Sequence, residues 1–101
     1  MALFWSDRAR NDLREIARYI SRSNPENARA FVLRLQIRAR IAAKTPRSGR
    51  RVPEFDAEDL REVLEGNYRI IYRLSGRRVE VVTVIEGRRL LRPTPENPEG
   101  A

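Results

Sequence analysis

The sequence predicts an α+β fold in which a helical hairpin packs on one face of a twisted antiparallel sheet, with the element order β-α-α-β-β-β. Three observations support this prediction. Apolar residues recur with helical spacing over residues 7–44, they alternate with polar residues from Leu60 onward, and the breaks between the alternating runs suit hairpin turns. With 101 residues, the chain has room for one hydrophobic core. We therefore expect one domain at residues 1–91, followed by a tail at residues 92–101.

The N-terminal segment predicts a short strand followed by a helix. Leu3–Trp5 is apolar, and Ser6 and Asp7 then provide an N-cap and an acidic first turn. A helix is expected over residues 7–22. Its apolar positions form one stripe with helical spacing: Ala9, Leu13, Ile16, Ala17 and Ile20. That stripe should face the core, while the arginine and acidic residues of the helix face water.

A second helix is expected over residues 25–44, directly after Asn24, which can cap it. Pro25 suits the first helical position because an N–H there would have no partner within the helix. One face of this helix is apolar: Ala28, Phe31, Val32, Leu35, Ala39 and Ala42. Since only two or three residues separate the two helices, they must form an antiparallel hairpin. Residues 45–58 are rich in proline, glycine and charge and are expected to form a loop.

Three strands are expected at about residues 60–65, 67–74 and 78–86, with hairpin turns at Gly66-Asn67 and Ser75-Gly76. In the last strand, one face is expected to carry Val79, Val81, Thr83 and Ile85. The C-terminal segment, residues 92–101, has three prolines and no apolar anchor, so we expect a disordered tail there.

The middle strand of this meander separates apolar from basic side chains. Because side chains alternate between the two faces of a strand, Arg69 and Arg73 project from the same face as Ile71. The opposite face carries Tyr68, Ile70, Tyr72 and Leu74. The apolar face belongs under the helices, which leaves the other face of the sheet available for function.

Composition excludes several classes of function. The chain has no cysteine and no histidine, so disulfides, thiolate chemistry, histidine triads and zinc sites built on these ligands are ruled out. It also lacks a glycine-rich phosphate loop, and we expect no metal and no cofactor. No apolar run approaches the roughly 20 residues of a membrane span, and the N-terminus lacks the regions of a signal peptide. A cytoplasmic protein is therefore expected.

The chain is strongly basic. It has 21 Lys and Arg against 14 Asp and Glu, a formal net charge of +7. All but one of the basic residues are Arg, whose planar guanidinium binds phosphates and carboxylates through paired hydrogen bonds. A polyanionic or acidic partner is therefore expected. The acidic run Asp56, Glu58 and Asp59 is interpreted as a solvated part of the loop.

The candidate functional residues are five arginines on or directly after the expected strands. They are Arg61, Arg69, Arg73, Arg88 and Arg89. We expect them to converge on the helix-free face, where they would bind phosphates or an acidic protein surface. The alternative is a solvated face whose arginines pair with nearby acidic residues: Glu62, Glu65, Glu80 and Glu86. The sequence leaves both interpretations open.

Six short motifs follow one another between residues 3 and 91. In order, they are Ala9-x-x-Asp12-Leu13-x-x-Ile16-x-x-Tyr19-Ile20, Asn24-Pro25-x-x-Ala28-x-x-Phe31, Pro46-x-x-Gly49-Arg50, Leu60-Arg61-Glu62, Tyr68-Arg69-Ile70-x-Tyr72-Arg73 and Val81-x-x-Val84-x-x-Gly87-Arg88-Arg89. Together they resemble the RelE/ParE superfamily of toxins from type II toxin–antitoxin systems. The resemblance implies the same fold, a toxin activity of the kind linked to plasmid stabilisation, and a cognate antitoxin through which the toxin oligomerises.

The resemblance implies one of two activities. RelE-like members cut mRNA in the ribosomal A site with basic residues, and by that pattern Arg69 and Arg89 occupy catalytic positions. This sequence departs from the pattern, since Leu60 and Glu62 stand where lysines are expected and residues 92–101 hold no tyrosine. Arginine is also a poor general base because it stays protonated.

ParE-like members instead inhibit DNA gyrase and lack that catalytic set. We therefore favour a ParE-like gyrase inhibitor that is neutralised by its antitoxin and is not an enzyme. The alternative is a RelE-like ribosome-dependent mRNA endonuclease. A second alternative, which rests on charge alone, is a basic nucleic-acid-binding module without toxicity.

Overall fold

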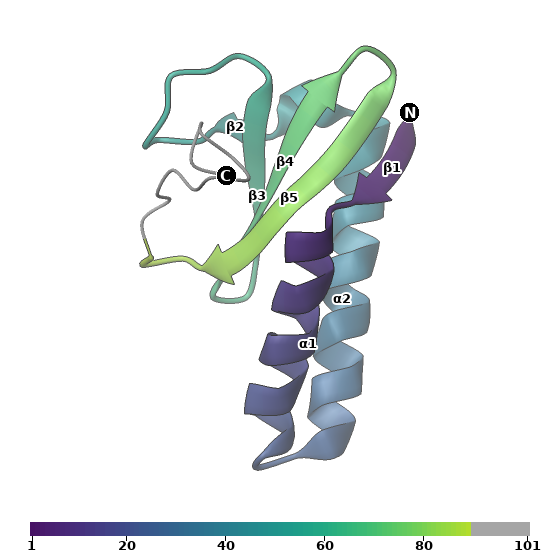
Figure 1. The fold of residues 1–101 in the computed structure, drawn as a ribbon, viewed down its shortest axis with the longest axis vertical. Helices are drawn as coiled ribbons and strands as arrows, with labels where there is room; N and C mark the ends of the chain where they lie inside the picture. Colours follow the sequence, from purple (N-terminus) through teal and green to yellow (C-terminus); the bar gives the residue numbers. More distant parts are fainter. Residues whose placement is uncertain (90–101) are drawn as a thin grey trace.

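The structure of the protein is a computed structural model that describes residues 1–89. Its elements are β1 (Ala2–Trp5), α1 (Asp7–Ser21), α2 (Pro25–Lys44), the 3-10 helix η1 (Pro46–Ser48), β2 (Arg50–Arg51), β3 (Leu60–Glu65), β4 (Tyr68–Ser75) and β5 (Arg78–Glu86) (Figure 1). The α+β class and the order of the main elements are confirmed. The expected domain end at residue 91 and the expected tail at residues 92–101 lie outside the described residues.

The sheet is mixed rather than wholly antiparallel. Within residues 1–89, it has five strands in the order β1-β5-β4-β3-β2, and β3, β4 and β5 form the expected antiparallel meander. β1 instead runs parallel to β5, from Ala2 opposite Arg78 to Trp5 opposite Val81. The next residue, Ser6, donates its backbone N–H to the Val81 carbonyl at 3.0 Å. This bond continues the pairing to the start of α1.

The short strand β2 lies within the segment that was expected to be only a loop. Arg50 pairs with Glu62 and Arg51 with Arg61, so β2 extends the sheet beyond β3. A two-residue strand shows no alternation of apolar and polar residues, and the sequence therefore gives no sign of it.

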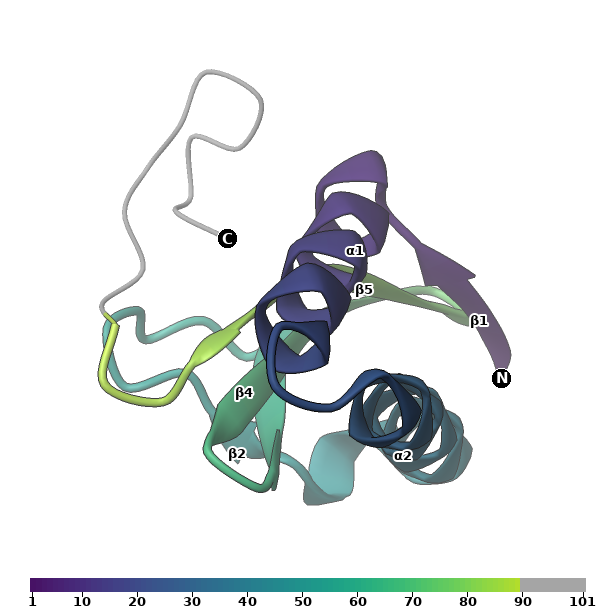
Figure 2. The same ribbon diagram turned by 90° about the horizontal axis from the view of Figure 1, so that it is seen from below.

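Both helices begin where the capping residues place them. Ser6 accepts a hydrogen bond from the Ala9 N–H at 3.0 Å, and Asn24 accepts one from the Asn27 N–H at 3.1 Å. Figure 2 shows α1 and α2 side by side across the sheet. Asp12 on α1 reaches β5, where its carboxylate accepts the Val84 N–H at 3.0 Å. β1 ends opposite Val81, so it does not extend far enough to pair with Val84 of β5. The Asp12 carboxylate accepts the hydrogen bond of the Val84 N–H in its place.

The main core lies between the helical hairpin and the sheet. Its buried members are Ala9, Leu13, Ile16, Leu35, Ala39, Ala42, Ala43, Val63, Ile70, Tyr72, Val79, Val81 and Val84. Phe31, Tyr68 and Leu74 are partly buried against this cluster. The predicted apolar faces of both helices and of β4 are therefore confirmed. Four of the helix contributions are alanines, which let the backbones of the helices approach the sheet closely.

The expected alternation along β5 is wrong after Val81. Ile71 lies opposite Thr83 and Tyr72 opposite Val81, so Val82 is an extra residue on β5. Such a bulge shifts the side-chain alternation by one position. As a result, Val84 packs in the main core, whereas Ile85 packs on the opposite face of the sheet.

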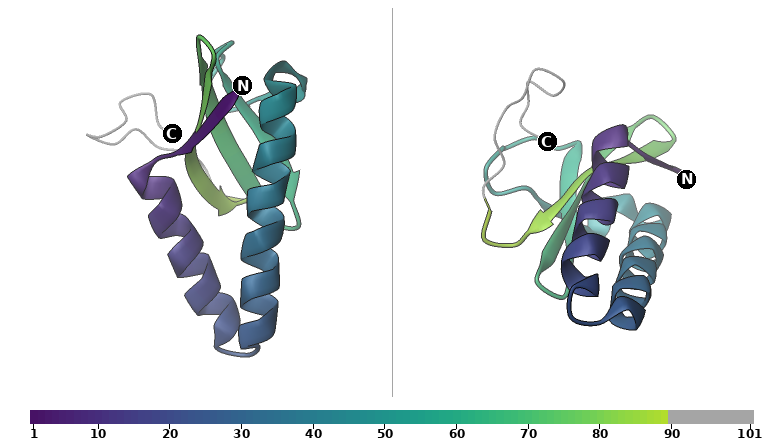
Figure 3. Two further views of the ribbon diagram at one scale, coloured as in Figure 1. Left: turned by 90° about the vertical axis from the view of Figure 1, so that its right-hand side faces the viewer. Right: turned by 60° about the horizontal axis from the view of Figure 1, so that its bottom comes forward.

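A second apolar cluster covers part of the face that was expected to be free. It contains Val52, Leu60, Ile71, Val82 and Ile85, with Phe55 and Ala57 packed against it. The loop of residues 52–59, which supplies three of these residues, lies across the sheet from α2 (Figure 3, right). This face carries apolar side chains from three strands, and burying them requires a cover. The loop provides that cover.

Replacing Leu35 by Asp should abolish cooperative folding. Leu35 is fully buried in the main core, and an unpaired carboxylate there would cost several kcal/mol. Thermal unfolding followed by circular dichroism checks this. Leu33→Asp is the matched control because Leu33, on the same helix, is exposed. If Leu35→Asp melted as cooperatively as the control, the assignment of the core face of α2 would be wrong.

Candidate functional site

Arg69 of β4 is buried among carboxylates. Its side chain is 4% exposed, and its Nε and Nη2 donate to Oε1 of Glu62 at 2.9 and 2.6 Å. Nη1 and Nη2 donate to the two carboxylate oxygens of Glu54, both at 2.7 Å. Nη1 also donates to the Arg89 carbonyl at 3.0 Å. A guanidinium has five N–H donors, and these hydrogen bonds occupy all of them.

Strand register explains why Glu62 meets Arg69. Leu64 lies opposite Arg69, and Glu62 precedes Leu64 by two residues on β3, so Glu62 and Arg69 are diagonal neighbours on one face. The Glu62 side chain is fully buried and also accepts a hydrogen bond from Arg50 Nε at 2.5 Å. Its charge is therefore shared between two arginines from the strands on either side.

Glu54 comes from the loop of residues 52–59 and completes the network. The loop is fixed in place by the buried Val52 and by Phe55, which pack in the second cluster. The hydrogen bonding of the Arg69 guanidinium to the Glu54 carboxylate is the main factor that raises the pKa of Arg69 above its usual value. We call Arg50, Glu54, Glu62 and Arg69 the Arg69 network; it has two positive and two negative charges.

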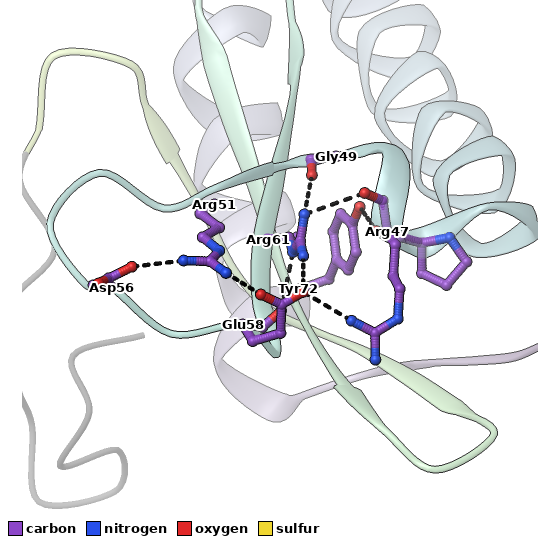
Figure 4. Close-up of polar contacts among 8 residues, drawn as sticks. Arg47, Gly49, Arg51, Asp56, Glu58, Arg61 and Tyr72 are labelled. Carbon is purple, nitrogen blue, oxygen red and sulfur yellow. Dashed lines mark hydrogen bonds and ion pairs between the residues drawn. The ribbon is translucent and has the colours of Figure 1, made fainter.

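A second network forms around Glu58 (Figure 4). Its carboxylate accepts hydrogen bonds from Arg51, from Arg47 at 3.0 Å and from Arg61 at 2.5 Å. Arg51 also bonds Asp56 at 2.8 Å. These bonds, that from Arg51 above all, hold the pKa of Glu58 below its usual value. The interpretation of the acidic run as merely solvated is wrong for Glu58, which joins three arginines at the base of the loop.

Arg61 does not lie on the helix-free face as expected. It pairs with Tyr72, whose side chain is in the main core, so both residues project toward the helix side of the sheet. At the sheet edge, Arg61 Nη1 donates to the Gly49 carbonyl at 3.0 Å, as Figure 4 shows. The reason is that side chains alternate between the two faces of a strand. Glu62 lies on the face that carries Arg69, so the preceding residue, Arg61, lies on the opposite face.

The remaining candidate residues divide between two regions. Arg88 and Arg89 follow β5 and are exposed, and Arg88 lines a depression of about 250 Å³ together with Arg50 and Arg69. Arg73 lies further along β4, where its Nε is 4.0 Å from an Asp59 carboxylate oxygen. The structure thus brings Arg69 and Arg88 together and holds the Arg89 carbonyl against Arg69, while Arg89 itself lines a separate depression beside α1. Arg61 and Arg73 lie elsewhere.

Sequence reasoning missed Glu54 and Arg50, and it placed Glu62 only among the possible partners of a solvated face. The two-residue turn Gly66-Asn67 fixes the register of β3 and β4, so the diagonal contact between Glu62 and Arg69 could have been predicted from the sequence. The contact between Glu54 and Arg69 could not have been predicted, because a loop has no strand register. Within residues 1–89, no group of acidic side chains is arranged to hold a metal ion, and no helix is long and apolar enough to cross a membrane.

Fold and motifs together define a small toxin of the RelE/ParE type. The chain belongs to the ParE family: the model described as "ParE toxin of type II toxin-antitoxin system, parDE" matches residues 3–91. Among solved structures, the chromosomal ParDE TA system from P. aeruginosa is similar, with a TM-score of 0.70 and 19% identity over 85% of this chain and 95% of that chain. At this identity, the similarity shows a shared fold. No curated protein matches the chain.

Replacing Arg69 by Met should destabilise the protein by about 3–5 kcal/mol, because Glu54 would lose the Arg69 cation and the buried Glu62 would keep only Arg50. The loss should be smaller near pH 5 than near pH 8, since burial of an unpaired carboxylate raises its pKa and protonation then relieves the penalty. Urea unfolding at both pH values measures this. The exposed Arg88→Met should change stability by less than about 0.5 kcal/mol. Equal effects of the two substitutions would argue against a structural network.

Proposed function

We propose that this ParE-family toxin inhibits DNA gyrase by binding it and is neutralised by a cognate antitoxin. The observation that carries the proposal is the saturation of Arg69. Glu54, Glu62 and the Arg89 carbonyl together occupy every N–H of its guanidinium. The position that the RelE pattern assigns to a phosphate-stabilising cation therefore has no donor left for a phosphate.

The nuclease alternative also conflicts with the charge around Arg69. Cleavage of RNA through the 2′-OH requires a group that takes a proton and cations that stabilise the charge that builds up on the phosphate. A phosphate at Arg69 would have to displace Glu54 and would then approach the buried carboxylate of Glu62. Repulsion between these anions opposes catalysis. This favours a protein that acts by binding.

The exposed arginines after β5 are the best candidates for contact with the target. Arg88 and Arg89 are exposed at the end of the sheet. Arg88 lines the depression that Arg50 helps to line, and Arg89 lines a separate depression beside α1. In this proposal, Arg69 is a positioning residue, since its Nη1 holds the Arg89 carbonyl. Arg61 and Arg73 lie away from this end and contribute to the fold. The target-binding surface is thus smaller than the five-arginine face that the sequence suggested.

Purified wild-type protein should inhibit DNA supercoiling by gyrase and leave ribosome-bound mRNA uncut. Arg88→Ala and Arg89→Ala should each weaken inhibition by about 1–2 kcal/mol, roughly 5- to 30-fold, as expected for single contacts in an interface. The control is Arg77→Ala, which removes an exposed arginine from the β4–β5 turn. In cells, induction should cause filamentation and DNA damage signalling while translation continues.

Cleavage of mRNA on programmed ribosomes, abolished by Arg69→Ala, would overturn this proposal in favour of the RelE-like alternative. A chain that inhibits neither process and is harmless when expressed alone would support the non-toxic nucleic-acid-binding module. The antitoxin part is tested separately, by asking whether co-expression of the small gene adjacent to the toxin gene suppresses toxicity. The proposal also places the protein in the cytoplasm, where gyrase acts.

A further inference from the structure

Two of the three tyrosines in the chain line one depression at an end of the sheet. Figure 1 shows the β3–β4 turn and the end of β5 at this same end. The lining includes Tyr19 of α1, Phe31 of α2, Tyr68 of β4, Glu86 of β5 and the Gly66-Asn67 turn. The volume is about 380 Å³, within the range of about 300–1,000 Å³ that is typical of ligand pockets. We call it the aromatic depression.

The three aromatic rings differ in how much of them remains open. Phe31 and Tyr68 form a ring pair with centroids 5.5 Å apart and planes at 53°, and both are half-buried. Tyr19, by contrast, is 66% exposed. Arg22 lies over the Tyr19 ring at 6.0 Å, and Arg34 lies over the Phe31 ring at 5.0 Å. The depression therefore offers a flat apolar ring to a ligand, and arginines surround it.

Glu86 places a carboxylate beside these rings. It lies opposite Tyr68 in the strand register, so the two side chains project from the same face of the sheet. Burial and, after it, the nearby Glu86 charge raise the pKa of Tyr68. The exposed Glu86 side chain makes no hydrogen bond or ion pair within residues 1–89. Its two oxygens can thus accept hydrogen bonds from a ligand.

A ring to stack on and an acceptor-only group beside it are the two features with which proteins recognise an unstacked nucleobase. A carboxylate only accepts hydrogen bonds. Guanine presents two adjacent donors, N1–H and the 2-amino group, on its Watson–Crick edge. Adenine, cytosine and uracil each place an acceptor next to the donor on that edge, which a carboxylate would repel. Guanine therefore suits Glu86 best.

A phosphate-binding group lies next to the aromatic depression. Asn67 and Glu86 also line the depression of about 250 Å³ that contains Arg69 and Arg88. Arg69 has no free N–H, as described above. Arg88, however, is exposed and makes no ion pair within residues 1–89. Its guanidinium is suited to bind a phosphate through paired hydrogen bonds and would offset the repulsion between that phosphate and Glu86.

We propose that the aromatic depression binds the guanine base of a nucleotide. The base stacks on Tyr19 and donates N1–H and its 2-amino group to Glu86, while Arg88 binds the phosphate. A basic peptide would also pair with Glu86, but Arg22 and Arg34 beside the rings and the net charge of +7 oppose it. The proposal does not depend on gyrase inhibition, since binding is measured on the toxin alone.

The test is a titration of the purified full-length protein with guanosine monophosphate (GMP), followed by NMR of the tyrosine rings. The signals of Tyr19 and Tyr68 should shift and saturate. Tyr72 is the internal reference, because it is buried in the core and its hydroxyl donates to the Pro46 carbonyl at 2.6 Å. GMP should bind about 10-fold more tightly than AMP, CMP or UMP. Inosine monophosphate, which lacks the 2-amino group, should bind with intermediate affinity.

Variants then locate the binding site. Glu86→Gln should weaken GMP binding about 10-fold and remove the preference for guanine, and Tyr19→Leu should weaken GMP binding about 10-fold through loss of stacking. The matched controls are Glu80→Gln and Phe4→Leu. Glu80 is an exposed glutamate of β5 outside the depression, and Phe4 is a 40% exposed ring with Arg78 over it at 4.1 Å. Both controls should bind GMP within about 2-fold of wild type. Circular dichroism verifies that each variant is folded.

A uracil oligonucleotide that contains one guanine distinguishes two sources of the base. If it binds more tightly than GMP and Tyr19→Leu weakens that binding, the ligand is a guanine within a single strand. If it binds no more tightly than GMP, the ligand is a free nucleotide. Either result supports the proposed base site.

Three results would overturn the proposal. The first is the absence of a saturable shift of Tyr19 and Tyr68 with GMP. The second is an equal affinity for all four nucleotides that Glu86→Gln leaves unchanged, because arginines would then bind the phosphate alone. The third is a triarginine peptide that binds more tightly than GMP and loses its binding in Glu86→Gln, which would assign the depression to a basic protein partner.

Discussion

The burial of the Arg69 guanidinium is the constraint on which the sheet side of the molecule depends. A buried charge is tolerated only where opposite charges and hydrogen bonds surround it. Here the partners come from β3, from the loop of residues 52–59 and from the end of β5, through Glu62, Glu54 and the Arg89 carbonyl. Each of these segments must stay in place for Arg69 to be satisfied. The position of the loop and the direction of the chain after β5 are thereby tied to one side chain.

Because of this constraint, the arginines of the sheet do not form the open anion-binding surface that the sequence suggested. Arginines that look like an anion-binding cluster in the sequence are instead neutralised by acidic residues of the same chain, as Arg69 is by Glu62 and Arg61 by Glu58. Among residues 1–89, the basic side chains without an ion pair lie mostly on the helical hairpin, and the others are Arg77, Arg78, Arg88 and Arg89 at the two ends of β5.

Local signals made much of the fold predictable. Ser6 and Asn24 cap the helices as expected, and Gly66 and Gly76 adopt the positive φ angles, 57° and 59°, that their hairpin turns require. What the sequence could not reveal depends on non-local pairing. The bulge at Val82 breaks an alternation that looks regular in the sequence, and the contact of Glu54 with Arg69 spans 15 positions and has no periodic signature. Of the candidate arginines, Arg88 lines the same depression as Arg69, and Arg69 holds the Arg89 carbonyl. Arg61 lies on the other face of the sheet.

The central claim is that Arg69 is a structural cation held by acidic residues of its own chain. A double-mutant cycle tests it most directly, by comparing the free energies of unfolding of the wild type, Arg69→Met, Glu54→Gln and the double variant. If the pair acts as a unit, the two effects should be non-additive, with a coupling energy of about 2 kcal/mol. Effects that add within about 0.5 kcal/mol would contradict the account, because Arg69 would then not depend on Glu54 and would be available to an anionic ligand.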